Sequence, residues 1–125
     1  MPKKILILDD EELIIRTLAR LLEKSGYEVL VVKNGQDAVA MVEEDEIDLI
    51  ISDIRMPGLN GLEAMKSVCQ KQEQNGKKKI PLIFITGYAD LHLEQEAKEL
   101  KPVDYIYKPF DLSELMTKVK EALQN

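Results

Sequence analysis

Side chains able to do chemistry stand at several places where an apolar run of this sequence ends. Asp9 and Asp10 follow residues 5–8, Asp53 closes residues 49–53, Thr86 closes residues 81–86, and Lys108 follows residues 105–107. A carboxylate at the end of a buried strand is costly unless solvent, a cation or a chemical role compensates. We therefore interpret Asp53 as the acceptor of a phosphoryl group, with the other groups arranged around it.

Carboxylates that converge on one edge of a sheet repel one another and favour a bound cation. Mg²⁺ suits them, because it prefers oxygen ligands, keeps several waters and completes its shell with a phosphate oxygen. Such an ion would offset charge during phosphoryl transfer. Lys108 could place its ammonium against the same oxygens, and Thr86 could offer its hydroxyl to one of them. Gly87 would let the backbone approach closely.

Each of these residues, taken alone, also has a purely structural explanation. Aspartates such as Asp10 are common turn formers and helix caps. A single lysine is more often a surface residue, and a single threonine at Thr86 is typical of a strand. Their joint placement at the ends of expected strands is what favours a shared site.

Alternating apolar and amphipathic segments would position these residues. We expect strands at residues 3–8, 29–32, 49–53, 81–86 and 105–107. Helices are expected at residues 11–25, 34–44, from about 62, at 90–100 and after Asp111, the 90–100 helix being the least firmly packed. Strands that alternate with helices in this way predict a parallel sheet covered on both faces. Such sheets bind ligands at the carboxyl ends of their strands.

Helical spacing predicts which faces of the first and last helices point inward. In the first helix we expect an inner face of Ile14, Leu18 and Leu21, with Ile15 partly exposed beside the acids. In the last helix the expected inward residues are Leu112, Leu115, Val119 and Leu123.

Composition excludes several classes of protein. The 125 residues are enough for one domain, and a net charge of −6 argues against a nucleic-acid surface. The single Cys69 cannot form an internal disulfide, and the single His92 rules out a histidine-rich zinc site. There is no signal peptide and no apolar stretch long enough to span a membrane, so we expect a cytoplasmic protein.

The sequence resembles the receiver domain of two-component response regulators over residues 1–125. The matching pieces are residues 7–11 (ILDDE), residues 52–61 (SDIRMPGLNG), residues 85–87 (ITG) and residues 105–110 (YIYKPF). The resemblance implies a flavodoxin-like, doubly wound (βα)5 three-layer sandwich with a parallel sheet of order 2-1-3-4-5.

The resemblance also implies roles for the site residues. Asp53 would accept a phosphoryl group from a histidine kinase or histidine phosphotransfer protein, with Thr86 and Lys108 completing the site. The implied Mg²⁺ ligands are Asp10, Asp53 and the backbone carbonyl of Arg55, with Asp9 acting through a bound water.

Signalling by such a domain would pass from the site to a surface. Thr86 and Tyr105 match the family's switch pair, which would alter the surface of the fourth helix, fifth strand and fifth helix. That surface would control an effector domain or protein, and a phosphorylation-dependent dimer is a further expectation. The Lys108–Pro109 bond is implied to be cis, although proline statistics alone favour trans.

The resemblance gives three more residues an expected role. Arg55 and Tyr88 would flank the path of the water that hydrolyses the phosphorylated aspartate, and so set its lifetime. Ile15 would contact the phosphodonor protein. One departure from the family pattern is residues 99–104, which lack its usual glycine-containing turn before the fifth strand.

Two other functions compete with the signalling interpretation. An aspartate-nucleophile phosphatase typically carries a second aspartate two positions after the first, where this chain has Arg55. A pseudo-receiver that has lost phosphorylation usually lacks an acid, the threonine or the lysine, and all are present here. A P-loop nucleotide motif is absent. The sequence leaves open whether the domain stands alone or begins a longer regulator.

Overall fold

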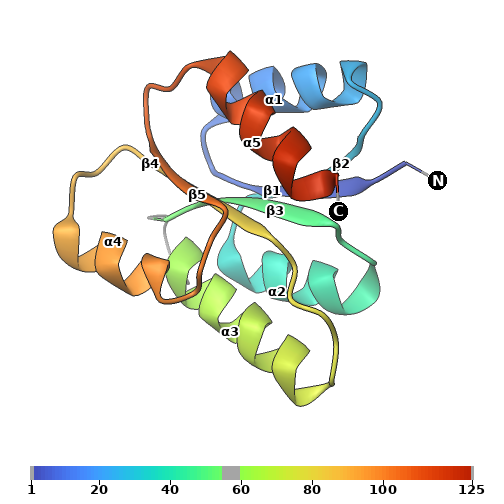
Figure 1. Cartoon of the computed structure of the whole chain (residues 1–125), viewed down its shortest axis with the longest axis vertical. Coiled ribbons are helices and arrows are strands. Elements are labelled where there is room, and N and C mark those ends of the chain that lie inside the picture. Colours follow the sequence, from blue (N-terminus) through green and yellow to red (C-terminus); the bar gives the residue numbers. More distant parts are fainter. Residues whose placement is uncertain (1, 55–59, 125) are drawn as a thin grey trace.

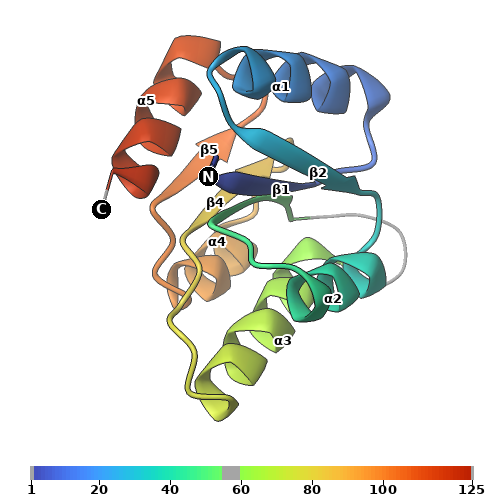
Figure 2. The same cartoon turned by 90° about the vertical axis from the view of Figure 1, so that its right-hand side faces the viewer.

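The computed structural model of the chain describes residues 2–54 and 60–124, which form a parallel sheet between two layers of helices (Figures 1 and 2). The strands are β1 (Lys4–Leu8), β2 (Glu28–Val32), β3 (Leu49–Asp53), β4 (Leu82–Thr86) and β5 (Asp104–Tyr107). The helices are α1 (Glu12–Lys24), α2 (Gly35–Glu44), α3 (Gly61–Gln74), α4 (Leu91–Lys98) and α5 (Leu112–Leu123).

The sheet has the order β2-β1-β3-β4-β5, as expected, and every neighbouring pair is parallel. Its register fixes which strand ends lie side by side. Leu8 pairs with Ser52, and Thr86 pairs with Tyr107, so the residues that follow these positions emerge at one edge of the sheet. The chain turns from β1 outward to β2 and then crosses to β3, which places the switch point of the sheet beside Asp9 and Asp53.

Two apolar clusters, one on each face of the sheet, make the core. Alternate residues of β1 divide between them: Leu6 and Leu8 face the α2, α3 and α4 layer, whereas Ile5 and Ile7 face the α1 and α5 layer. Strands β3 and β4 are buried along their whole length, because helices cover both faces of the sheet. Their mostly apolar sequences suit this position. This rigid centre holds the carboxyl ends of β1, β3 and β4 in place.

The expected inner faces of two helices are wrong in part. The buried residues of α1 are Ile15, Leu18 and Leu22, so the helix is rotated about its axis from the expected orientation. Ile15 is only 7% exposed, which contradicts its predicted exposure, and Leu13 is the exposed residue, at 76%. Three consecutive apolar residues follow Glu12 in the first turn of this helix, so spacing alone could not choose between two equally apolar faces. Leu112 is likewise partly exposed at the first turn of α5.

Helix α4 is the shortest of the described helices and buries only Ala97, in agreement with its weak periodicity. Of the helices in the described ranges, none is long and apolar enough to cross a membrane.

The connection from α4 to β5 contains a strained residue. Lys101 has a φ of 53°, in the left-handed region, and no other non-glycine residue of the described chain has a positive φ. The Lys79 ammonium donates to the carbonyl oxygens of Leu100 and Lys101, satisfying two acceptors at the end of the helix. Residues 99–104 contain no glycine, although the left-handed conformation at Lys101 is one that favours glycine.

Replacing Lys101 with glycine should stabilise the domain. The left-handed conformation costs an ordinary residue roughly 1–2 kcal/mol, and glycine avoids this cost. Glycine also raises the entropy of the unfolded chain, which offsets part of the benefit, so we expect the free energy of unfolding to rise by about 0.5–1 kcal/mol. Urea unfolding measures it, with Lys101→Ala as the control, because alanine removes the same side chain but keeps the strain. An equal effect of the two substitutions would show that the backbone strain contributes nothing.

Candidate functional site

Three carboxylates gather at the carboxyl edge of the sheet. One oxygen each of Asp9, Asp10 and Asp53 lies within 4.8 Å of the others. Asp53 is the last residue of β3, and Asp9 and Asp10 follow the neighbouring strand β1. Asp9 and Asp53 are buried, whereas Asp10 is exposed, so the cluster opens to solvent on one side.

Lys108 brings a positive charge to the same group. Its backbone N–H donates to the carbonyl of Thr86 at 2.7 Å, which fixes the chain just after β5. Its Nζ lies 3.1 Å from Asp9 Oδ2, 3.1 Å from Asp53 Oδ2 and 2.6 Å from Glu11 Oε1. Burial lowers the pKa of Lys108, but the hydrogen bond to Glu11 and the charge of Asp53 outweigh it and raise the pKa above its ordinary value. The ammonium therefore stays charged among these acids.

The donor set of the cluster fits Mg²⁺. It consists of carboxylate oxygens, the hard ligands this ion prefers, and one of them is exposed, which leaves room for retained waters. Asp9 Oδ2 is buried and faces the Lys108 charge without a hydrogen bond from any described residue. This oxygen could therefore still accept a hydrogen bond from a water that the metal holds. The expected carbonyl ligand belongs to Arg55, which lies outside the described residues.

A glycine that spacing did not identify as important anchors Asp53. Helix α3 begins directly against the end of β3, where the Gly61 N–H donates to the carbonyl of Ile54 at 3.0 Å. A Cβ on Gly61 would lie 1.6 Å from the carbonyl oxygen of Asp53, a contact no side chain can make. The Ser52 hydroxyl also donates to that oxygen, at 2.9 Å. In the sequence, Gly61 ends the family-like segment 52–61 and follows Asn60, whose side chain caps the helix that Gly61 begins.

The expected switch residues flank the cluster on β4 and β5. The Thr86 side chain is buried, and its Oγ1 accepts a hydrogen bond from the Tyr88 N–H at 3.1 Å. The Tyr105 ring packs between Phe84 and Tyr107, at centroid distances of 6.3 and 5.5 Å. Its hydroxyl is buried without a hydrogen-bond partner among the described residues. Burial raises the pKa of Tyr105 to about 12, so the phenol is neutral at physiological pH.

The remaining expected residues are distributed as follows. The Lys108–Pro109 peptide bond is cis, as the family resemblance implied. Tyr88 is exposed after β4, while Ile15 is a buried residue of α1 and does not line the cluster as an accessible residue.

Fold and site together define a doubly wound α/β domain with an acid cluster and one lysine at its switch point. A family model, the response regulator receiver domain, matches residues 5–120. The chain therefore belongs to the receiver domain family of two-component response regulators. Such domains are phosphoacceptor signalling domains and not classical enzymes, which sets aside the phosphatase alternative.

Curated relatives differ in how much of their length this chain covers. It is 35% identical to sporulation initiation phosphotransferase F of Bacillus subtilis (strain 168), across 98% of this chain and 95% of that protein. It is also 35% identical to the regulatory protein AtoC of Escherichia coli (strain K12), across 97% of this chain but only 25% of AtoC. The chain thus spans nearly all of one relative and a quarter of another.

Solved structures share the fold closely. The Vibrio cholerae chemotaxis protein CheY4 is 29% identical, with a TM-score of 0.85 and coverage of 98% of this chain and 100% of that one. A Saccharomyces cerevisiae co-crystal structure contains the phosphotransfer protein Ypd1 and the receiver domain of the response regulator Ssk1. This chain matches that structure at 27% identity and a TM-score of 0.88, across 98% of this chain and 89% of the matched one.

Replacing Gly61 with alanine should destabilise the domain strongly. The added methyl group would overlap the Asp53 carbonyl and force the start of α3 away from β3, at a cost of about 3 kcal/mol. The control is Gly87→Ala, since a Cβ there meets nothing within 4 Å and φ is not positive. Denaturant unfolding compares the two; equal losses of stability would mean that α3 does not pack against Asp53 as described.

Proposed function

We propose that this domain accepts a phosphoryl group on Asp53 from the phosphohistidine of a histidine kinase or phosphotransfer protein, and so controls an effector. The observation that carries the proposal is the buried Asp53 carboxylate, which is grouped with Asp9 and Asp10 and lies 3.1 Å from the Lys108 ammonium. Membership of the receiver family supports the same chemistry.

In the transfer, a carboxylate oxygen of Asp53 attacks phosphorus. The new P–O bond forms as the P–N bond to the donor imidazole breaks, and the departing imidazole takes a proton from water or its own protein. The Lys108 ammonium and the Thr86 hydroxyl would each hold one phosphoryl oxygen.

Asp10, Asp53 and the carbonyl of Arg55 would hold Mg²⁺, with Asp9 contributing through a water. The bound ion would offset the negative charge that the phosphoryl group adds to a site already rich in carboxylates.

The phosphorylated state would change the surface formed by α4, β5 and α5. A phosphoryl group adds about −1.5 to −2 charges. Thr86 already accepts a hydrogen bond from the Tyr88 backbone, so its proton is available for a phosphoryl oxygen. As Thr86 moves, the Tyr105 ring could turn into the vacated volume, and its hydroxyl has no hydrogen bond to a described residue to lose. The altered surface would contact the effector or a second copy of the domain.

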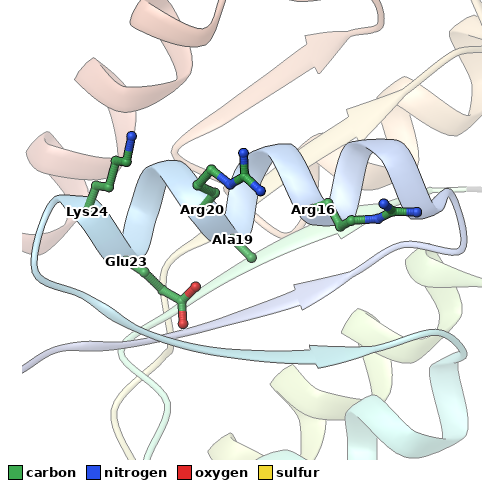
Figure 3. A pocket seen from close by; sticks show the side chains of 5 residues that line it. All are labelled: Arg16, Ala19, Arg20, Glu23 and Lys24. Carbon is green, nitrogen blue, oxygen red and sulfur yellow. The ribbon is translucent and has the colours of Figure 1, made fainter.

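The exposed face of α1 is the proposed docking surface for the phosphodonor protein. Leu13 is highly exposed one turn from the acids and takes the place predicted for Ile15. Arg16, Arg20 and Lys24 follow on successive turns of the helix and line a surface pocket there (Figure 3). These three cations outnumber Glu23, the acid that lines the same pocket, so the surface favours a donor with an acidic surface.

Hydrolysis of the phosphoryl group would be limited by the side chains beside it. Tyr88 is exposed two positions after Thr86, where its bulky ring could obstruct the attacking water. Arg55 is proposed for the same task.

The acceptor is tested with a small phosphodonor such as acetyl phosphate in the presence of Mg²⁺. Asp53→Asn should abolish incorporation without loss of stability, because the substitution keeps the side-chain shape and Lys108 keeps Asp9 and Glu11 as counter-charges. Asp45→Asn is the control, since Asp45 pairs with Lys4 at the opposite end of β1. Incorporation into Asp53→Asn at the wild-type rate would refute the proposed acceptor.

The docking surface is tested by comparing two donors. Leu13→Ala should slow transfer from a phosphorylated donor protein by about tenfold, as expected for a central apolar contact, and leave the reaction with acetyl phosphate nearly as fast. Leu91→Ala is the matched control, because Leu91 is 69% exposed but lies on α4. Equal slowing with both donors would place the defect in the site itself.

A further inference from the structure

The closest partner of the Lys108 ammonium is not one of the two buried acids. Glu11 Oε1 lies 2.6 Å from Nζ, whereas the nearest oxygens of Asp9 and Asp53 are both 3.1 Å away. The Glu11 side chain is 57% exposed, and that of Lys108 is only 10% exposed. A buried cation therefore makes its shortest contact with a carboxylate that faces water.

The backbone of Glu11 is fixed, while its side chain has no other role in the fold. Glu11 occupies the N-cap position of α1, yet its side chain makes no capping hydrogen bond. Its N–H donates to Asp9 Oδ1 at 3.0 Å, and its carbonyl accepts from the Ile15 N–H at 3.0 Å. The carboxylate can therefore swing into solvent without disturbing the helix or the loop.

An incoming phosphoryl group must compete with carboxylates for the Lys108 charge. The ammonium donates hydrogen bonds to Glu11 and Asp53 and lies 3.1 Å from Asp9 Oδ2, so three carboxylates already compensate its charge. Asp9 is fully buried, so losing its counter-charge would leave an uncompensated charge in the interior, which is strongly unfavourable. Glu11 can return to water, where the loss of an ion pair costs little. Glu11 is the partner that is released most easily.

We propose that Glu11 is a positioning residue that holds the Lys108 ammonium while Asp53 is unphosphorylated and releases it to the phosphoryl group. The inference rests on the proposed phosphorylation of Asp53. Glu11 thereby competes with the phosphoryl oxygens and weakens binding of phosphoryl groups at the site. It sets the balance between the free and phosphorylated forms and takes no part in the transfer of the phosphoryl group.

The test measures the affinity of the Mg²⁺-loaded protein for beryllofluoride, an unreactive mimic of an aspartyl phosphoryl group. Glu11→Gln should bind it about fivefold more tightly, the fold-change equivalent to an exposed ion pair. Glu11→Asp keeps the charge but is one methylene shorter, and should fall between the wild type and Glu11→Gln. Glu12→Gln is the matched control, because it removes the same charge from the next residue, whose partner is Lys33. It should leave the affinity within about twofold of the wild type.

Two further readouts separate positioning from a general structural effect. With acetyl phosphate, the half-saturating concentration of the donor should fall in Glu11→Gln by more than any change in the maximal rate. The NMR signal of the Lys108 side-chain nitrogen in the unphosphorylated protein should move in Glu11→Gln and Glu11→Asp, but not in Glu12→Gln.

The outcomes are distinguishable. Unchanged or weaker beryllofluoride binding in Glu11→Gln, when the wild type binds, would overturn the role of Glu11 alone. Tighter binding in Glu11→Gln with wild-type binding in Glu11→Asp would also overturn it, by showing that the charge acts without the contact. Failure of the wild type to bind beryllofluoride or accept phosphate would overturn the proposed function as well.

Discussion

Two buried carboxylates, Asp9 and Asp53, face a single ammonium, with Lys108 Nζ 3.1 Å from an oxygen of each. Buried charges without compensation are strongly destabilising, so this pairing constrains much of the structure. Strands β1 and β3 must be neighbours to bring the acids together, and β5 must end at the same edge to deliver the lysine. Each requirement is met by parallel strands whose carboxyl ends meet at one side of the sheet.

The site is held firmly but is not fully bonded. Gly61 permits α3 to begin against the Asp53 backbone, which fixes the acceptor. The buried strands β3 and β4 hold the carboxyl edge of the sheet in place. In contrast, Asp9 Oδ2 and the Tyr105 hydroxyl are buried without hydrogen bonds from described residues. Unused polar capacity of this kind costs stability, and functional sites are where proteins tolerate it. Here it lies where a cation, a phosphoryl group or a moving ring would use it.

Much of this architecture was predictable, because apolar runs identify central strands and alternation with helices implies a parallel sheet. The acids and Lys108 could be assigned to one edge for the same reason. Rotation of α1 could not be predicted, because its first turn offers several adjacent apolar residues. Ile15 is the buried one, whereas Ile14 is partly buried against the cluster that the sheet forms with α5. The importance of Gly61 was also hidden, since a contact with the Asp53 carbonyl depends on how α3 meets β3. The contact between Glu11 and Lys108 joins residues 97 positions apart, beyond any local pattern.

The central claim is that this charge cluster makes one particular carboxylate a phosphoryl acceptor. It is tested most directly by treating the phosphorylated wild-type protein with borohydride, which reduces an aspartyl phosphate to homoserine, and locating the altered residue by peptide mass spectrometry. Our account predicts homoserine at Asp53 and at no other aspartate. Reduction at Asp9 or Asp10 instead, or a phosphorylated protein with no residue that borohydride reduces, would contradict it.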